Sequence, residues 1–282
     1  MLVFDKKANL KAYLLGFTNN KSTIGFVPTM GALHDGHLSL MNFSLQINTI
    51  TVVSIFVNPT QFNNPEDLEK YPKTLPEDLE KIKNLNAEIV VYAPDVSDIY
   101  KGKTSTKSFN YDGLEHVMEG EHRPGHFDGV GTIVKKLFDI VNPTYAYFGE
   151  KDFQQLAIIK KMVGKEQLNV KIIGCTIFRE TNGLAMSSRN ERLSKPERQN
   201  AAIIFETLQE AKKLFVTKSA KEVTEFVTKI FLKVEGITME YFEIADESTL
   251  LSCIRKNKNK NYRAFIAVFV NNIRLIDNIS LK

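Results

Sequence analysis

Residues 24–37, IGFVPTMGALHDGH, predict a strand, a glycine-containing turn and the start of a helix. The apolar run at 24–27 is typical of a buried strand, and the periodic apolar positions over 38–47 are typical of a helix. His34 and His37 fall at the junction, where their spacing puts both imidazoles on one side of the first helical turn. That turn also offers backbone N–H groups and the positive end of the helix dipole, which favour a phosphate. The stretch therefore predicts an anion site and indicates an enzyme that uses a nucleotide.

Apolar runs and helical patterns keep alternating from residue 24 to about residue 178. Strand-like runs lie at residues 24–27, 50–57, 88–92, 144–148 and 170–177. Helical patterns lie between them, at residues 38–47, 76–85, 129–141 and 153–163. Several of the runs are apolar on both faces, which is typical of a parallel sheet covered by helices on both sides. We therefore predict an α/β fold, with a doubly wound, Rossmann-like parallel sheet in a domain spanning residues 1–178.

The pattern changes after about residue 190, where helices come first and strands follow. Residues 197–215 predict one helix, and Ser219 with Glu222 predicts a capping box for a second helix that reaches residue 234. Strands are expected at 238–244, 262–270 and 273–276. The chain from 179 to 282 is therefore predicted to form a smaller α+β domain, with a hinge at residues 180–183.

The composition excludes several classes of protein. The chain has 282 residues, 43% of them hydrophobic and 25% charged, and a net charge of +4, which is typical of a globular protein rather than a nucleic-acid binder. The basic cluster RKNKNK at 255–260 is most simply a solvated loop. Cys175 and Cys253 lie in apolar surroundings that favour buried thiols. With no signal-peptide pattern and no apolar run near 18 residues, we expect a cytoplasmic protein without a membrane or nucleic-acid partner.

Ligands of an open parallel sheet bind beyond the carboxyl ends of its strands. The segments that follow those ends are residues 30–37, 58–62, 149–152 and 179–189. Asn58 and Gln61 form either a plain proline turn or a pair of uncharged donors for a hydroxyl or carboxylate. Lys151 can meet a phosphate and Asp152 a ribose hydroxyl, with Gln155 one turn later, although charged residues are common where helices start.

Residues 186–189, MSSR, combine two hydroxyls and a guanidinium, which suit a polyphosphate or else make a capped turn. Two other classes of site are not supported. No Walker-type phosphate loop occurs, and the segment RPG separates His122 from His126, which breaks a helical zinc-ligand pair. Residues 129–134, GVGTIV, lack the third glycine of a dinucleotide fingerprint, so we interpret them as close packing at a helix start.

The complete set of motifs resembles one family, the pantoate–β-alanine ligases. The 34–37 segment is similar to the histidine signature of the nucleotidyl-transfer superfamily, which includes class I aminoacyl-tRNA synthetases. The matching pieces occur in order over most of residues 24–193, and they lie at 28–37, 56–62, 121–127, 147–152 and 183–192. The chain after residue 195 carries no comparable motif.

This resemblance implies an ATP-dependent, AMP-forming ligation of (R)-pantoate with β-alanine. Pantoate and ATP first give a pantoyl-adenylate and pyrophosphate with Mg²⁺, and the amine then displaces AMP. The resemblance also leads us to expect a homodimer. Because an acyl-adenylate hydrolyses in water, the second domain is expected to close as a lid.

The resemblance also implies roles for residues of this chain. ATP contacts are implied for the signature turn, the loop after the fourth strand run and the second loop: Met30, Gly31, Ala32, Leu33, His34, Asp35, Gly36, His37, Gly149, Glu150, Lys151, Asp152, Phe178, Met186, Ser187, Ser188 and Arg189. The catalytic residues implied are His34, His37, Lys151, Ser187, Ser188 and Arg189. Pantoate contacts are implied for Gln61 and Gln155, with Asn58 and Arg123 in support. Glu77 and Asp78 match a carboxylate pair that is linked to Mg²⁺ in some members. Ala32 replaces an asparagine that many members carry.

Three alternatives remain at this stage. The first is a nucleotidyltransferase that stops at a nucleotidylated product. The second is an RNA-binding protein that uses the basic loop 255–260, and the third is a nucleotide-binding module without catalysis. The motifs at 58–62 and 123–127 argue against the first, and the set of His34, His37, Lys151 and Arg189 argues against the third.

Overall fold

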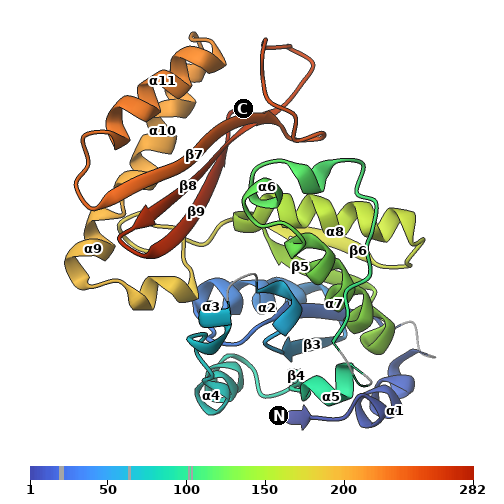
Figure 1. Ribbon diagram of the computed structural model, residues 1–282. Helices are drawn as coiled ribbons and strands as arrows, with labels where there is room; N and C mark the ends of the chain where they lie inside the picture. The colour runs from blue at the N-terminus through green and yellow to red at the C-terminus, as the bar shows by residue number, and fades with distance from the viewer. Residues whose placement is uncertain (19–21, 63–64, 101, 103) are drawn as a thin grey trace. The chain divides into compact units, whose positions relative to one another are not determined.

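The computed structural model describes residues 1–18, 22–62, 65–100, 102 and 104–282 (Figure 1). The contacts divide the chain into two compact units. The first contains Met1–Glu150 and Gln155–Thr176, and the second contains Lys151–Gln154 and Ile177–Lys282. The predicted domain boundary between residues 178 and 179 stays a prediction. The contacts also assign the four residues Lys151–Gln154 to the second unit.

The first unit is built on a six-stranded sheet in which every pair of neighbouring strands is parallel. The order is β1-β4-β3-β2-β5-β6. The bounds of these strands are β1 Leu2–Phe4, β2 Ile24–Thr29, β3 Ile50–Ile55, β4 Val90–Tyr92, β5 Tyr145–Gly149 and β6 Lys171–Cys175. The chain moves outward from β2 through β3 to β4, and then returns to the other side of β2 for β5. The carboxyl ends of β2 and β5 therefore flank the point where the winding reverses, which is where open sheets bind ligands.

Helices cover both faces of this sheet, as expected for strands that are buried throughout. All six residues of β3 are buried, so neither face of the strand meets water. The helices have the bounds α1 Lys7–Thr18, α2 Asp35–Ile47, α3 Pro65–Glu69, α4 Leu75–Leu85, α5 Val96–Ile99, α6 Glu119–His122, α7 His126–Val141 and α8 Phe153–Lys165. Short 3₁₀ turns lie at η1 Pro59–Gln61, η2 Leu114–His116 and η3 Glu150–Asp152. The predicted doubly wound α/β class is confirmed.

The structure corrects the sequence interpretation at several elements. The predictions missed β1, because a three-residue edge strand has too few positions to show a period, and they also missed α1. The strand predicted at 50–57 ends at Ile55, and the helix predicted from residue 129 begins at His126. The helix predicted at 197–215 is two helices, α9 Lys195–Asn200 and α10 Ile203–Phe215, with a turn at Ala201 and Ala202.

The second unit packs two of its helices on a small antiparallel sheet. The sheet order is β7-β8-β9, with bounds β7 Ile237–Asp246, β8 Tyr262–Val270 and β9 Ile273–Ser280. The helix α11, Ala220–Phe231, begins with the predicted capping box of Ser219 and Glu222. The 3₁₀ turn η4 spans Ser188–Arg192. The predicted hinge at 180–183 stays a prediction. Gly183 N donates to Glu180 O within a closed turn of this unit, and the contacts divide the chain between Thr176 and Ile177.

Candidate active site

The turn between β2 and α2 carries the histidine signature. Gly31 and Ala32 both take positive φ angles, 81° and 49°, so the chain leaves β2 through two successive left-handed residues. Glycine adopts this conformation without strain, whereas for alanine it has a cost that the surroundings must offset. Leu33, which is 2% exposed, anchors the turn in the core. The turn ends at His34, the N-cap of α2.

The two histidines are in contact at the start of α2. Their ring centroids are 4.0 Å apart with an interplanar angle of 31°. His34 N donates to His37 Nδ1 at 3.3 Å. His37 thus takes the place of the glutamate that accepts from the N-cap backbone in a common capping box. Because Nδ1 acts as an acceptor, the proton of a neutral His37 is assigned to Nε2. His37 therefore fixes its own ring and adds a donor to the positive helix end.

Asp78 reaches this turn from α4. Its side chain has no exposed surface, and its Oδ2 and Oδ1 accept from Ala32 N at 2.9 Å and Leu33 N at 2.7 Å. The N–H groups of Ala32 and Leu33 are thus bonded to Asp78, a partner on another helix that sequence reasoning missed. Glu77, the neighbouring carboxylate, is exposed. The pair that the resemblance links to Mg²⁺ does not converge on one point and does not fit a magnesium site.

The segment after β3 is fixed by contacts that the sequence did not reveal. Asn58 is fully buried; its Oδ1 accepts from Tyr100 Oη at 2.7 Å and its Nδ2 donates to Gly129 O at 3.4 Å. Gln61 follows in η1, and its main-chain oxygen lies 3.0 Å from His126 Nδ1 and accepts from Arg123 Nη2 at 3.4 Å. Asn58 and Arg123 therefore hold the backbone on which Gln61 sits.

The glycines of α7 explain how η1 comes so close to that helix. A Cβ on Gly129 would lie 2.2 Å from Thr60 O, and one on Gly131 would lie 2.1 Å from Tyr111 Oη. These distances are shorter than any contact between non-bonded atoms, so both positions require glycine. The interpretation of residues 129–134 as a close-packing segment is confirmed.

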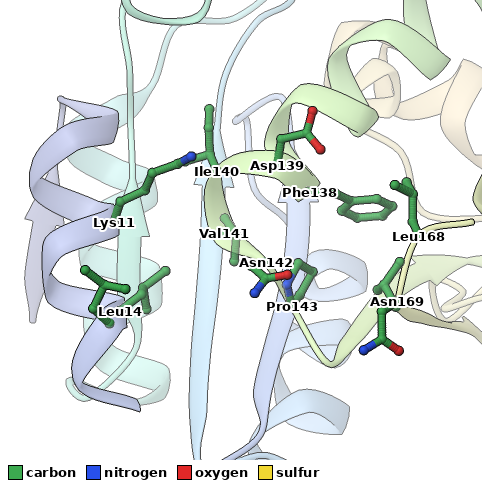
Figure 2. A pocket seen from close by; sticks show the side chains of 12 residues that line it. Lys11, Leu14, Phe138, Asp139, Ile140, Val141, Asn142, Pro143, Leu168 and Asn169 are labelled. Carbon is green, nitrogen blue, oxygen red and sulfur yellow. The ribbon is translucent and has the colours of Figure 1, made fainter. Parts of the chain in front are cut away.

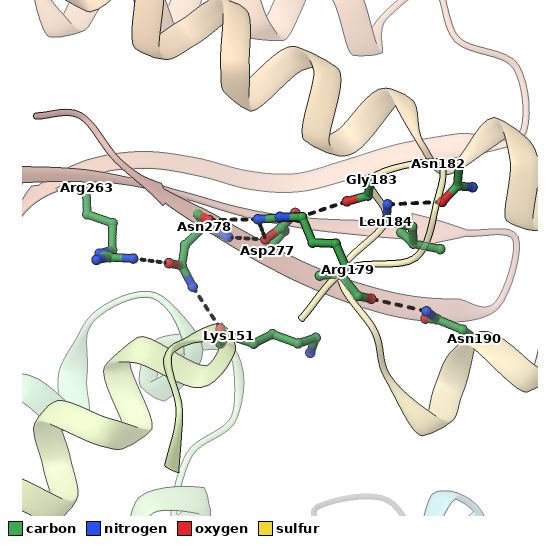
Figure 3. A network of polar contacts seen from close by, with 10 residues as sticks. Lys151, Arg179, Asn182, Gly183, Leu184, Asn190, Arg263, Asp277 and Asn278 are labelled. Carbon is green, nitrogen blue, oxygen red and sulfur yellow. Dashed lines mark hydrogen bonds and ion pairs between the residues drawn. The ribbon is translucent and has the colours of Figure 1, made fainter. Parts of the chain in front are cut away.

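The loop after β5 is shared between the two units. Gly149 ends β5 and Glu150 begins η3, both in the first unit, whereas Lys151 and Asp152 belong to the second unit. Figure 3 shows the polar contacts that hold this segment on the second unit: Asn278 Nδ2 donates to Lys151 O at 2.8 Å. Asn278 Oδ1 in turn accepts from Arg263 Nη1 at 2.6 Å. Gln155, half-buried, returns to the first unit.

Arg263 and a second arginine complete this network. The Arg263 guanidinium lies over the ring of Phe153, 4.0 Å from its centroid. Arg179 donates to both carboxylate oxygens of Asp277, at 2.6 and 3.0 Å, and lies 3.7 Å from the centroid of Phe205. Two stacked, hydrogen-bonded guanidiniums therefore tie β8 and β9 to the segments at 151–154 and 179.

The second predicted loop, residues 186–189, is a capped 3₁₀ turn. Ser187 Oγ accepts from Arg189 N at 3.3 Å. Asn190 is fully buried and donates to Ala185 O at 3.1 Å and Glu180 Oε1 at 2.6 Å. Phe178 is 41% exposed, and its main-chain oxygen accepts from Met186 N at 3.0 Å. The loop thus has a fixed backbone while Ser188 and Arg189 remain half-buried.

One pocket of the described chain lies away from the predicted site residues. A pocket of about 470 Å³ lies at the amino ends of β5 and β6, between α1 and the end of α7, and no predicted site residue lines it (Figure 2). Burial raises the pKa of the Cys175 thiol to about 11, with a smaller contribution from Glu150, so this thiol is not a nucleophile near neutral pH. Within the described ranges, no three His, Cys, Asp or Glu side chains gather as metal ligands, and none of the helices could cross a bilayer.

Comparison with known proteins finds relatives that match this chain over its length. The family model described as pantoate-beta-alanine ligase matches residues 2–280. The pantothenate synthetase of Flavobacterium psychrophilum is 71% identical over 282 residues, covering 100% of both chains. That of Christiangramia forsetii is 52% identical over the same length, also covering 100% of both chains.

Solved structures show the same fold. The crystal structure of pantothenate synthetase from Thermus thermophilus has a TM-score of 0.91 and 34% identity, covering 100% of this chain and 99% of that one. The pantoate-beta-alanine ligase of Francisella tularensis, crystallised with beta-gamma ATP and beta-alanine, has a TM-score of 0.82 and 34% identity. It covers 100% of this chain and 98% of that chain.

Proposed function

Because this chain belongs to the pantoate-beta-alanine ligase family, we propose that the carboxyl edge of its parallel sheet carries out the ATP-dependent ligation of (R)-pantoate with β-alanine. The observation that carries this proposal is the His34–His37 turn, which lies at the amino end of α2 and follows β2, beside the reversal of the winding. A helix end with two stacked imidazoles is suited to the phosphates of a nucleotide.

The chemistry proceeds in two displacements. An oxygen of the pantoate carboxylate attacks the α-phosphorus of ATP, the bond to the bridging oxygen breaks, and pyrophosphate leaves. The unprotonated amine of β-alanine then attacks the carbonyl carbon of the pantoyl-adenylate, AMP leaves with the bonding electrons, and the nitrogen loses a proton. No protein nucleophile is required, so the residues act by binding and by stabilising charge.

The phosphate contacts are proposed for three segments of the chain. In the turn after β2, His34 and His37 donate to phosphate oxygens, together with the N–H group of Met30, whereas the N–H group of Gly31 donates to Thr29 Oγ1 at 3.3 Å. In the segments at 149–152 and 186–189, Lys151, Ser187, Ser188 and Arg189 supply the cationic and hydroxyl donors. The remaining ATP contacts are proposed for Asp35, Gly36, Gly149, Glu150, Asp152, Phe178 and Met186. Donors fixed before the reaction stabilise the charge that builds on the α-phosphate without a cost of reorganisation.

Pantoate is proposed to bind through Gln61 and Gln155. An amide donates to a carboxylate and accepts from a hydroxyl without adding charge, so the carboxylate stays nucleophilic. The contacts of Gln61 O with Arg123 and His126 support this assignment, because they fix the backbone that carries the side chain.

Mg²⁺ and a homodimer complete the proposal. Mg²⁺ is proposed as the ion that accompanies ATP, since this ion binds readily to substrate phosphates. Glu77 and Asp78 do not fit as its ligands, and the binding roles proposed above do not depend on it. The dimer is checked by light scattering of the purified chain.

One assay tests the function. Exchange of labelled pyrophosphate into ATP is expected to require pantoate but not β-alanine, because the adenylate forms before the amine reacts. With all substrates present, AMP, pyrophosphate and pantothenate are expected in equal amounts. Release of ADP and orthophosphate, or exchange without pantoate, would refute the proposal.

A further inference from the structure

One face of α4 holds the backbone of the turn after β2. Asp78 accepts from the N–H groups of Ala32 and Leu33, and Lys81, one helical turn later, donates from Nζ to Leu33 O at 2.6 Å. Thr74 Oγ1 also donates to Asp78 Oδ2, at 3.2 Å. Three hydrogen bonds from two side chains on α4 therefore fix two consecutive residues of the turn.

These bonds act at the strained point of the turn. Ala32 has a φ of 49°, a conformation that costs a non-glycine residue free energy and persists only where neighbouring contacts hold it. Bonds to a charged acceptor are about twice as strong as bonds between neutral groups. Gly31 leaves the space that Asp78 needs, because a Cβ there would lie 3.1 Å from Asp78 Oδ2.

The surroundings of Asp78 argue against a metal ligand. Both of its oxygens accept from N–H donors, and the Lys81 ammonium lies in the same cluster, bonded to Leu33 O. An N–H group and a nearby ammonium both compete with a divalent cation for carboxylate oxygens. The adjacent Glu77 is exposed, so the two carboxylates of the pair lie in different surroundings.

We propose that Asp78 and Lys81 are positioning residues that hold the phosphate-binding turn in its ATP-binding conformation, and that Asp78 acts through the turn rather than through a cation. The proposal rests on the proposed function, because it assumes that ATP phosphates meet this turn. It assigns to Asp78 the task of aiming the N–H group of Met30 and the ring of His37.

Binding of ATP without a metal gives the sharpest test. In EDTA, the shift in melting temperature caused by ATP is measured for the wild-type protein and for Asp78→Asn, Glu77→Gln and Glu80→Gln. Asparagine keeps one acceptor but turns an NH₂ group toward the second N–H, so the Asp78→Asn protein should need roughly 5- to 150-fold more ATP for the same shift. Glu77→Gln and Glu80→Gln, at exposed positions of α4, should match the wild type. Equal ATP dependence for Asp78→Asn and the wild type would overturn the proposal.

Pyrophosphate exchange gives the second readout. Asp78→Asn should raise the KM for ATP by the same factor, while the Mg²⁺ concentration for half-maximal rate stays the same as in the wild type. A raised Mg²⁺ requirement, or recovery of the rate at high Mg²⁺, would show a metal ligand instead.

A second variant tests the proposal if the Asp78→Asn protein does not fold. Lys81→Met removes the bond to Leu33 O and leaves Asp78 in place, and it should raise the KM for ATP several-fold with the same Mg²⁺ dependence. An unchanged KM would overturn the proposal. A different result would refute the proposed function, namely the absence of pantoate-dependent pyrophosphate exchange by the wild-type protein. This inference concerns only the ratio of the KM for ATP between each variant and the wild type.

Discussion

At the scale of single residues, His37 couples the start of a helix to a ligand donor. Its Nδ1 accepts from the backbone of His34, and its Nε2 is proposed to donate to a phosphate. His37→Ala should therefore lower the rate of pyrophosphate exchange by about 10²–10³-fold, which is typical for the loss of one fixed donor to a developing charge. The lost cap should cost only about 1 kcal/mol of stability.

His116→Ala is the matched control. The His116 side chain is 78% exposed and lies in η2, outside the segments that follow the strand ends, so its loss should leave the exchange rate unchanged. Near-normal exchange by His37→Ala, with a folded protein shown by circular dichroism, would mean that the anion site is assigned to the wrong turn.

Gln61 and Gln155 allow substrate holding to be separated from nucleotide binding. Each lost amide leaves partner groups unsatisfied, at a cost of about 1–3 kcal/mol, so Gln61→Ala and Gln155→Ala should raise the KM for pantoate roughly 5- to 150-fold. ATP affinity measured without pantoate should stay the same. Gln46→Ala, at an exposed position of α2, serves as the control. Weaker ATP binding with an unchanged pantoate KM would place the two glutamines in the nucleotide site.

At the scale of elements, two helical glycines differ in the space available for a side chain. Gly129 lies in α7, where a Cβ would meet Thr60 O at 2.2 Å, whereas Gly164 lies in α8, where a Cβ would have no atom within 4 Å. Gly129→Ala should push η1 away from α7, lower the melting temperature and raise the KM for pantoate through Gln61.

Gly164→Ala should instead leave the activity unchanged and stabilise the protein by up to about 1 kcal/mol, because alanine is the better helix former. Thermal unfolding and pantoate titration of the two variants check both statements. Equal melting temperatures would show that the backbone of η1 yields to the added methyl group without cost.

The cap of α11 gives a prediction about pH. Bonds from the backbone and side chain of Ser219, with Lys218 nearby, lower the pKa of Glu222 to about 2 from its ordinary 4.5. A carboxyl whose pKa is lower in the folded state stabilises the protein above its unfolded pKa, and this contribution disappears as the pH falls from about 4.5 to 2. Glu222→Gln should therefore flatten the fall of the melting temperature over that range. An unchanged slope would exclude a role for this cap in acid unfolding.

At the scale of the whole molecule, the segment that carries Lys151 is held by contacts with residues distant in the sequence. Lys151 belongs to the second unit, although β5 of the first ends only two positions before it, at Gly149. Its main-chain oxygen is held by Asn278, which is 1% exposed and is bonded in turn to Arg263 (Figure 3). The position of Lys151 thus depends on the fold of β8 and β9.

Asn278→Ala should lower the exchange rate about tenfold, because the lost bond releases the backbone that carries Lys151, at a cost of about 1–1.5 kcal/mol. Asn259→Ala, in the exposed part of the loop before β8, is the control. The KM for pantoate should not change, since Gln61 and Gln155 lie in the first unit. A raised pantoate KM with a normal exchange rate would contradict this division of roles.

Features that depend on close neighbours in the chain could be predicted from the amino-acid sequence. The strand, turn and helix at 24–47, the pairing of His34 with His37, and the capping box of Ser219 and Glu222 all follow from short spacings along the chain. The apolar runs at β2 and β3, buried on both faces, likewise determined the parallel α/β class. Short or exposed elements such as β1 lack enough positions for a pattern, and so they were missed.

The pairing of distant polar groups could not be predicted from the sequence and is seen in the folded chain. Asp78 bonds to a residue 46 positions away, Tyr100 reaches Asn58 across 42 positions, and Asn278 holds Lys151 across 127. The sequence placed Asp78 beside Glu77 as a metal pair, yet the turn of α4 buries one carboxylate against a backbone and exposes the other. Periodicity is set by residues within one helical turn or two strand positions, whereas the partner of a buried polar group is set by the segments that the core brings together.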